Sequence, residues 1–318
     1  GCAPAEDAPV DPGRPVDPLA LPDVSGVDLP AAYADAFALA LSVRAATAWS
    51  GHVAALDLRA PGCPDLWAGA PGDALDLDVD DGVSWADHCA AGTIDFGGAV
   101  WWESAVAIDG DPNDVEGVTT DASRRLVGDA VVGQAGDARF ELDGEASDAF
   151  SRTIAPGYDH WTWSSRVHGT VTGADVVGAT ATPGGYRADL YLSVEGGDAA
   201  RLEGRGNLYL FEDRVAERFD SVAMDLAYLG VGGPNDCTLE PYGWMSLRDT
   251  DAYWYDLVFL PGDSETVDTG ADPACDGCGT LYVRGVESGE VCVDLSAAWD
   301  GRLDPPAVED YVLSIHGM

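Results

Sequence analysis

Hydrophobic and polar positions alternate with a period of two over most of the chain after residue 92. The segment 186–195 (YRADLYLSVE) places its apolar side chains on one side and its charged side chains on the other, and segments 93–108 and 218–229 repeat the pattern. Such alternation predicts β-strands with one buried and one solvated face. Further short strands are separated by turn sequences such as DGDPND and GGPND, with no helical pattern between them. The pattern therefore predicts an antiparallel meander.

One earlier segment, residues 28–49, has a helical period instead. Tyr33, Phe37 and Leu41 recur four residues apart, and Asp28 is a suitable N-cap residue. We predict a helix there, which either continues or breaks and resumes before the sequence PGCPDLW ends it.

Glycines stand in the middle of five of the predicted strands, where a glycine usually marks a bend or a bulge. They are Gly98, Gly128, Gly144, Gly169 and Gly204. A shared crease would curl the sheet, whereas chance enrichment among the 39 glycines is the alternative. We expect mainly β structure: a large curved antiparallel β-meander, either a half-barrel or an open barrel, with the N-terminal α-helix packed on its concave side.

This pattern divides the chain into three parts. Residues 1–27 contain many prolines among small and acidic residues and are expected to form a disordered tether. Residues 28–62 form the N-terminal helical segment, and residues 63–318 form the curved antiparallel β domain with its disulfides.

The seven cysteines indicate the compartment. Gly1 and Cys2 resemble the last two positions of a bacterial lipobox, which implies a lipid anchor on Cys2; an ordinary free cysteine is the alternative. The six others are an even number in a body that looks exported, so we expect disulfides. They are Cys63, Cys89, Cys237, Cys275, Cys278 and Cys292.

We expect Cys63 to pair with Cys89, because both are distant in sequence from the other four, which would pair among themselves. The CDGC sequence leaves two alternatives open. With Cys237 and Cys292 it could form a four-thiolate zinc site, or its own cysteines, Cys275 and Cys278, could form a redox CxxC pair.

Charge excludes several functions. The chain has 56 acidic residues against 16 basic ones and a formal net charge of −40. A protein with this much negative charge repels nucleic acid, so nucleic acid is excluded as a partner. All basic residues are arginine, which excludes phosphate-binding loops, Schiff-base chemistry and kinase chemistry that require a lysine.

Two segments contain candidate site residues. The histidines of HWTWSSRVHGTVTG, residues 160–173, lie eight residues apart in a predicted strand, about 26 Å from one another, so they cannot share a metal. We therefore interpret this segment as a structural strand. In DGDPNDVEG, alternating oxygen ligands resemble the opening of a calcium loop, although an acidic turn is the alternative. These candidate ligands are Asp109, Asp111, Asn113 and Asp114.

Several longer phrases resemble a group of uncharacterised, Asp-rich bacterial exported lipoproteins. They are GCPDLW, DGVSWADHCAAGTIDFGGAVWW, CTLEPYGWMSLRD and CDGCGTLYVRGVESGEVCVDLS, within residues 63–296. The resemblance implies an exported compartment and β architecture, and it implies no activity.

From these observations we expect a non-enzymatic lipid-anchored exported protein of the bacterial cell envelope, an outer-membrane or surface lipoprotein in an oxidising compartment. It would contact the membrane through Cys2 and bind an apolar ligand or an envelope protein, or act as a structural component. Calcium is the only candidate cofactor. The alternative is an extracellular enzyme or a calcium-dependent carbohydrate-binding module.

Overall fold

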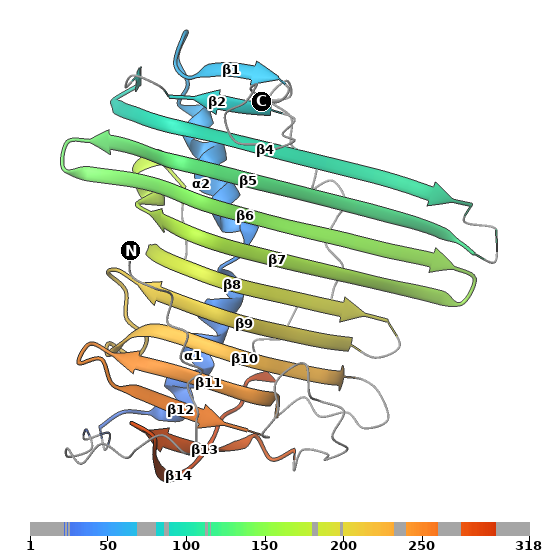
Figure 1. Ribbon diagram of the computed structural model, residues 1–318, viewed down its shortest axis with the longest axis vertical. Helices are drawn as coiled ribbons and strands as arrows, with labels where there is room; N and C mark the ends of the chain where they lie inside the picture. The colour runs from blue at the N-terminus through green and yellow to red at the C-terminus, as the bar shows by residue number, and fades with distance from the viewer. Residues whose placement is uncertain are drawn as a thin grey trace.

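The computed structural model is one large open antiparallel sheet with two helices packed on one face (Figure 1). It describes residues 22, 24, 26–68, 81–85, 89–111, 114, 116–179, 184–197, 200–231, 240–259 and 275–296. The expected tether, 1–27, lies almost wholly outside the described residues. The helices are α1 (Leu29–Ser42) and α2 (Ala45–Asp57), with a 3₁₀ turn at Ala174–Val177. The strands are β1 (Asp65–Ala68), β2 (Asp81–Ser84), β3 (Cys89–Ala91), β4 (Ile94–Gly110), β5 (Val118–Ala135), β6 (Ala138–Ala155), β7 (Tyr158–Thr172), β8 (Gly185–Gly196), β9 (Ala200–Leu210), β10 (Phe219–Val231), β11 (Tyr242–Asp249), β12 (Trp254–Val258), β13 (Cys278–Val283) and β14 (Val286–Cys292).

The strands follow one another across the sheet almost in chain order. From β4 to β14 each strand pairs with the next one, always antiparallel, while β2 and β3 pair with different parts of β4. Short connections between consecutive alternating segments favour this meander. The predicted antiparallel sheet is confirmed, and it is open, with β1 and β14 at its ends.

The predicted helix breaks and resumes. The Asp28 carboxylate accepts a hydrogen bond from the Ala31 N–H at 3.2 Å and caps α1 as expected. Val43 and Arg44 are extended, and the Ala45 N–H at the start of α2 donates to the Ser165 hydroxyl of β7 at 3.0 Å. A sheet side chain therefore satisfies one of the backbone donors that the new helix leaves open.

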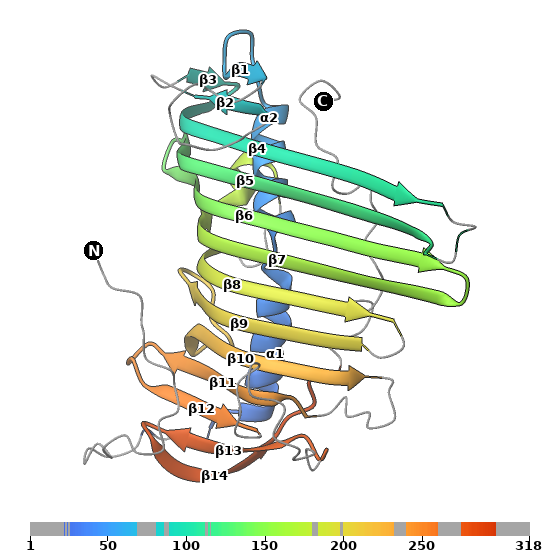
Figure 2. The same ribbon diagram turned by 45° about the vertical axis from the view of Figure 1, so that its right-hand side comes forward.

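The helices fill the side of the sheet around which it curls (Figure 2). Tyr33 and Phe37 are fully buried; the Tyr33 hydroxyl donates to the Tyr255 carbonyl at 2.7 Å, and the Phe37 ring lies 6.3 Å from that of Tyr228. Within the described part of the chain, neither helix is long and apolar enough to be a membrane span.

Three of the five predicted crease glycines form one row across the sheet. Gly144 of β6 pairs with Gly128 on one side and Gly169 on the other. Gly144 has φ of +121°, and a Cβ there would lie 2.2 Å from the His168 carbonyl oxygen, so only glycine fits. Figure 2 shows the sheet curling at the N-terminal half of β6, which contains this residue.

The other two glycines differ from the expectation in part. Gly98 lies at a register shift between β4 and β5, as a bulge glycine would. Gly204 has ordinary strand geometry, and the left-handed φ of +120° belongs to Gly206 instead. The alternating pattern places both on one strand and does not distinguish which of them is deformed.

The long strands β4 to β7 extend beyond the helices (Figures 1 and 2). Here the apolar alternation continues without burial: Val106 is 41% exposed and Ile108 is 69% exposed. On the same face and strand, Phe96, Val100 and Trp102 are buried. The sequence pattern therefore identified the apolar face of β4 correctly, while the length of the helices determines how much of that face is buried.

Candidate functional site

The cysteines form structural cross-links in the described residues. Cys63 is bonded to Cys89, and Cys278 is bonded to Cys292, which confirms the first expected pair and one pair within the C-terminal group. Cys275 is also disulfide-bonded. Cys2 and Cys237 lie outside the described residues. Disulfides indicate an oxidising, extracellular compartment.

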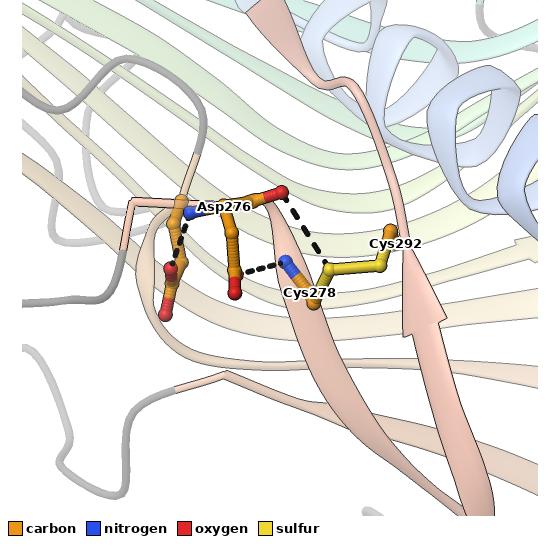
Figure 3. Close-up of a disulfide and its surroundings, with 4 residues drawn as sticks. Asp276, Cys278 and Cys292 are labelled. Carbon is orange, nitrogen blue, oxygen red and sulfur yellow. Dashed lines mark hydrogen bonds between the residues drawn. A yellow bond between two sulfur atoms is a disulfide. The ribbon is translucent and has the colours of Figure 1, made fainter.

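The Cys278–Cys292 bond ties β13 to the edge strand β14 (Figure 3). Asp276 holds the preceding turn, because its carboxylate accepts the Cys278 N–H at 3.0 Å and its own N–H donates to Glu240 at 3.3 Å. Burial of the Glu240 side chain raises the pKa of that carboxyl.

This bonding disagrees with both alternatives for the CDGC sequence. Cys275 and Cys278 are not bonded to each other, as a redox CxxC pair would be. The zinc alternative needs Cys278 and Cys292 as separate thiolates, whereas their sulfurs are joined. The nearby carboxylate of Glu290 completes a group with metal-ligand spacing, but a disulfide is not a zinc ligand.

The calcium candidates lie at the tip of β4. The Asp109 carboxylate accepts the Gly110 N–H at 2.9 Å, and the Asp111 carbonyl accepts the Asp114 N–H at 3.0 Å, so this is a hydrogen-bonded acidic turn. Asn113 lies outside the described residues. Among the described side chains, these aspartates do not converge within metal-ligand distance of one another.

The segment 160–173 belongs to strand β7, as predicted. Its two histidines bind different carboxylates: His160 Nε2 lies 2.8 Å from Glu195 Oε1, and His168 Nδ1 lies 3.4 Å from Asp189 Oδ1. Trp161 and Val167, on the opposite face, are buried. The two imidazoles are therefore members of a solvated sheet face and do not form one site.

A further candidate site is a groove of about 550 Å³ on the sheet face opposite the helices, which we call the outer groove. Two adjacent cross-strand rows from β4 to β9 form it. The first row consists of Ala105, Ser123, Ala149, Ser164, Ser193 and Glu203. The second row consists of Ala107, Asp121, Ser151, Thr162, Glu195 and Arg201.

Small side chains make this part of the face hollow. Directly paired residues on antiparallel strands point to the same side, so the register brings five hydroxyl groups and three alanine methyl groups together on five strands. Tyr191, on the next row, stands at the wall, with the Arg205 guanidinium 4.8 Å from its ring. The volume lies within the usual range for a small-molecule site, about 300–1,000 Å³.

Three of the four charged side chains that line the groove interact with a neighbouring side chain. Arg201 forms an ion pair with Glu203, and Glu195 binds His160. Asp121 remains as an exposed carboxylate. The groove is consequently rich in hydroxyl groups and slightly acidic, which disfavours anionic ligands.

The opposite face, beneath α2, is packed. The Arg124 guanidinium and the Asp148 carboxylate form a bidentate pair at 2.9 and 3.0 Å, with Arg124 beneath the Trp49 ring. A further space beneath Ala48 measures about 10 Å³, too small for a ligand. The expected apolar ligand stays a prediction.

Sequence reasoning missed the outer groove. A signal was present, because some solvated positions of β5 to β8 are small where charged or long side chains are usual on an exposed strand; they are Ser123, Ala149, Ser151, Thr162, Ser164 and Ser193. Without the register, however, these serines and alanines could not be assigned to one row.

The comparisons give no relative for this chain: no known protein family, curated protein or solved structure matches it. The candidate site therefore depends on its own geometry.

Proposed function

We propose that this protein is a non-enzymatic binding protein of an exported, oxidising compartment, which holds a polyhydroxylated ligand such as a short oligosaccharide in the outer groove. The observation that supports it most is the pair of cross-strand rows, in which five hydroxyl side chains and three alanines line one hollow. Hydroxyl and carboxylate side chains exchange hydrogen bonds with sugar hydroxyls, and the alanines leave room for the ring.

The charge of the groove supports an uncharged ligand. The Arg201–Glu203 ion pair and the His160–Glu195 hydrogen bond orient their carboxylates, which can accept further hydrogen bonds from a ligand hydroxyl. A phosphate or uronate group would meet Asp121 and the field of a chain with net charge −40.

Membrane attachment is part of this proposal. A lipid on Cys2 would hold the sheet at a distance set by the proline-rich residues that precede α1. Mass spectrometry of the protein isolated from its native membrane should find a diacylated Cys2, and an unmodified Cys2 would remove the anchor.

Binding is tested by screening the purified protein against an array of neutral oligosaccharides, followed by calorimetric titration of any that bind. Ala149→Tyr places a ring in the centre of the groove and should weaken binding more than about tenfold, a loss of about 1.4 kcal/mol. Asn207→Tyr is the matched control, since Asn207 is exposed on β9 of the same face and does not line the groove.

The proposal fails if no neutral glycan binds, or if both variants retain full affinity. Repeating the titration in EDTA separates it from calcium-dependent recognition, because the groove should bind equally well without the ion. Melting temperatures of both variants should match that of the parent, which excludes misfolding as the cause of a loss.

A further inference from the structure

Strand β4 has a part of its edge that no described strand covers. Its residues Ile94–Phe96 pair with β3, and Ala99–Trp102 pair with β2. On the other side β4 pairs with β5 all the way to Gly110. Among the described residues, Ala105–Gly110 therefore has a strand neighbour on one side only; we call this segment the β4 free edge.

The side chains of the β4 free edge are those of a strand interior. Val106 and Ile108 are exposed to 41% and 69%, and they point to the same face, with the small residues Ala105 and Ala107 on the other. Ala105 to Ile108 carry no charge in a chain of net charge −40. An exposed apolar edge with unpaired backbone groups readily accepts another strand.

The terminal strands of the sheet are protected, in contrast. Strand β1 has only four residues. Strand β14 carries Glu287 and Glu290, meets β13 with a register shift, and is bonded to it by Cys278–Cys292. Charges, bulges and short length are the usual devices that prevent edge pairing. The part Ala105–Ile108 of the β4 free edge carries no charge, and its pairing with β5 has no register shift.

We propose that the β4 free edge is a docking site for an extended, cationic segment of a partner protein, which adds to the sheet as a further antiparallel strand. Backbone hydrogen bonds would supply the pairing, and an apolar side chain at alternate positions would cover Val106 and Ile108. Acidic residues border the uncharged part, Glu103 before it and Asp109 after it. Glu103 already forms an ion pair with Arg125 at 3.9 Å, so arginine or lysine in the incoming segment would complement Asp109 and the net charge of −40.

Charge disfavours a second copy of this chain as the occupant. Each copy carries a formal charge of −40, and a two-fold pairing centred on Val106 places Asp109 of one copy opposite Glu103 of the other. Like charges directly opposite each other destabilise a strand pair.

The experiment uses the full chain and a short synthetic peptide with alternating valine and threonine and arginine at both ends. Successive backbone N–H groups of a strand point to opposite sides, so about half of those in Ala105–Gly110 point toward β5 and half point away from it. Hydrogen exchange should show the amide groups that point away from β5 exchanging rapidly in the free protein and slowing when the peptide is added. The same peptide with alternate backbone nitrogens methylated retains its charge but cannot form the ladder, and it should not protect them.

Ile108→Ser tests the apolar contact and should weaken peptide binding about tenfold. Ile154→Ser is the matched control. Ile154 is 42% exposed at the same end of the sheet, but its strand is paired on both sides, so its loss should leave the affinity unchanged.

Three outcomes would overturn the proposal. If the methylated peptide bound with the same affinity as the unmodified one, charge alone would account for the interaction. Protection of the amide groups that point away from β5 in the free monomer would mean that the chain covers this edge itself, and their protection on dimer formation would mean a second copy. Ligand binding in the outer groove is measured separately with Ala149→Tyr, so the two proposals can fail independently.

Discussion

His52 makes the stability of this protein depend on pH in a way that one substitution should remove. The imidazole is 3% exposed in α2, with its ring centroid 6.3 Å from that of Trp49 and 5.0 Å from that of Trp102. Its Nε2 has no hydrogen-bond partner among the described residues. Burial lowers the pKa of His52 from 6.5 to about 3, because the apolar surroundings disfavour the imidazolium.

The direction follows from proton binding. Below pH 6.5 the unfolded chain takes up a proton on His52, whereas the folded protein does so only near pH 3. The unfolded state therefore binds more protons in this window, and the free energy of unfolding falls as the pH falls. The stabilisation is fully present above pH 6.5, and two pH units below that value about 3 kcal/mol of it is lost.

The substitution is His52→Phe, which keeps a ring among the tryptophans and cannot ionise. Urea unfolding, followed by tryptophan fluorescence at pH 7.5, 6.0 and 4.5, gives the free energy of unfolding of each protein. Both proteins lose stability through their shared carboxyl groups, but the parent should lose about 3 kcal/mol more between the first and last pH.

The matched control is His168→Gln, since the His168 side chain is 65% exposed on the outer face. That variant should follow the parent curve. Parallel pH curves for the parent and His52→Phe would refute the argument, because they would show that His52 is protonated equally in both states.

Two further predictions concern the sheet. Gly144→Ala should lower the free energy of unfolding by at least about 2 kcal/mol, because position 144 has φ of +121° and the new Cβ would lie 2.2 Å from the His168 carbonyl oxygen. Gly136→Ala, in an open turn, should lower the free energy of unfolding by less in the same urea titration. Equal losses in the two variants would contradict a structural requirement for glycine at position 144. Replacing Cys278 and Cys292 together by serine should lower the stability by about 3 kcal/mol, since it opens a loop with a sequence separation of 14. An unchanged melting temperature would show that β14 does not unfold with the rest of the sheet.

Local pattern predicted the elements well. The capping role of Asp28, the strand at 160–173 and the antiparallel sheet are all found, because capping and side-chain alternation act over a few residues. The break between α1 and α2 was left open, and it is Ser165, over a hundred residues away, that binds the N-terminus of the second helix.

The candidate sites depended on longer-range geometry. The outer groove exists because Ser123, Ala149 and Ser164 stand opposite one another on three strands, and a shift of one residue would point one of them into the core. The β4 free edge depends on strand lengths: among the described residues β2 pairs with β4 only as far as Trp102, while β5 continues to Gly110.

The amino-acid sequence by itself determined the period of each element, the negative field of the protein and a cysteine set suited to disulfides, since these properties belong to short segments or to composition. Tertiary structure alone decided which small side chains share a row, which apolar side chains the helices cover and which strand edge has no partner among the described strands. The physical reason is that strand register and helix packing minimise the free energy of the whole sheet, so residues far apart in the chain determine the environment of each position.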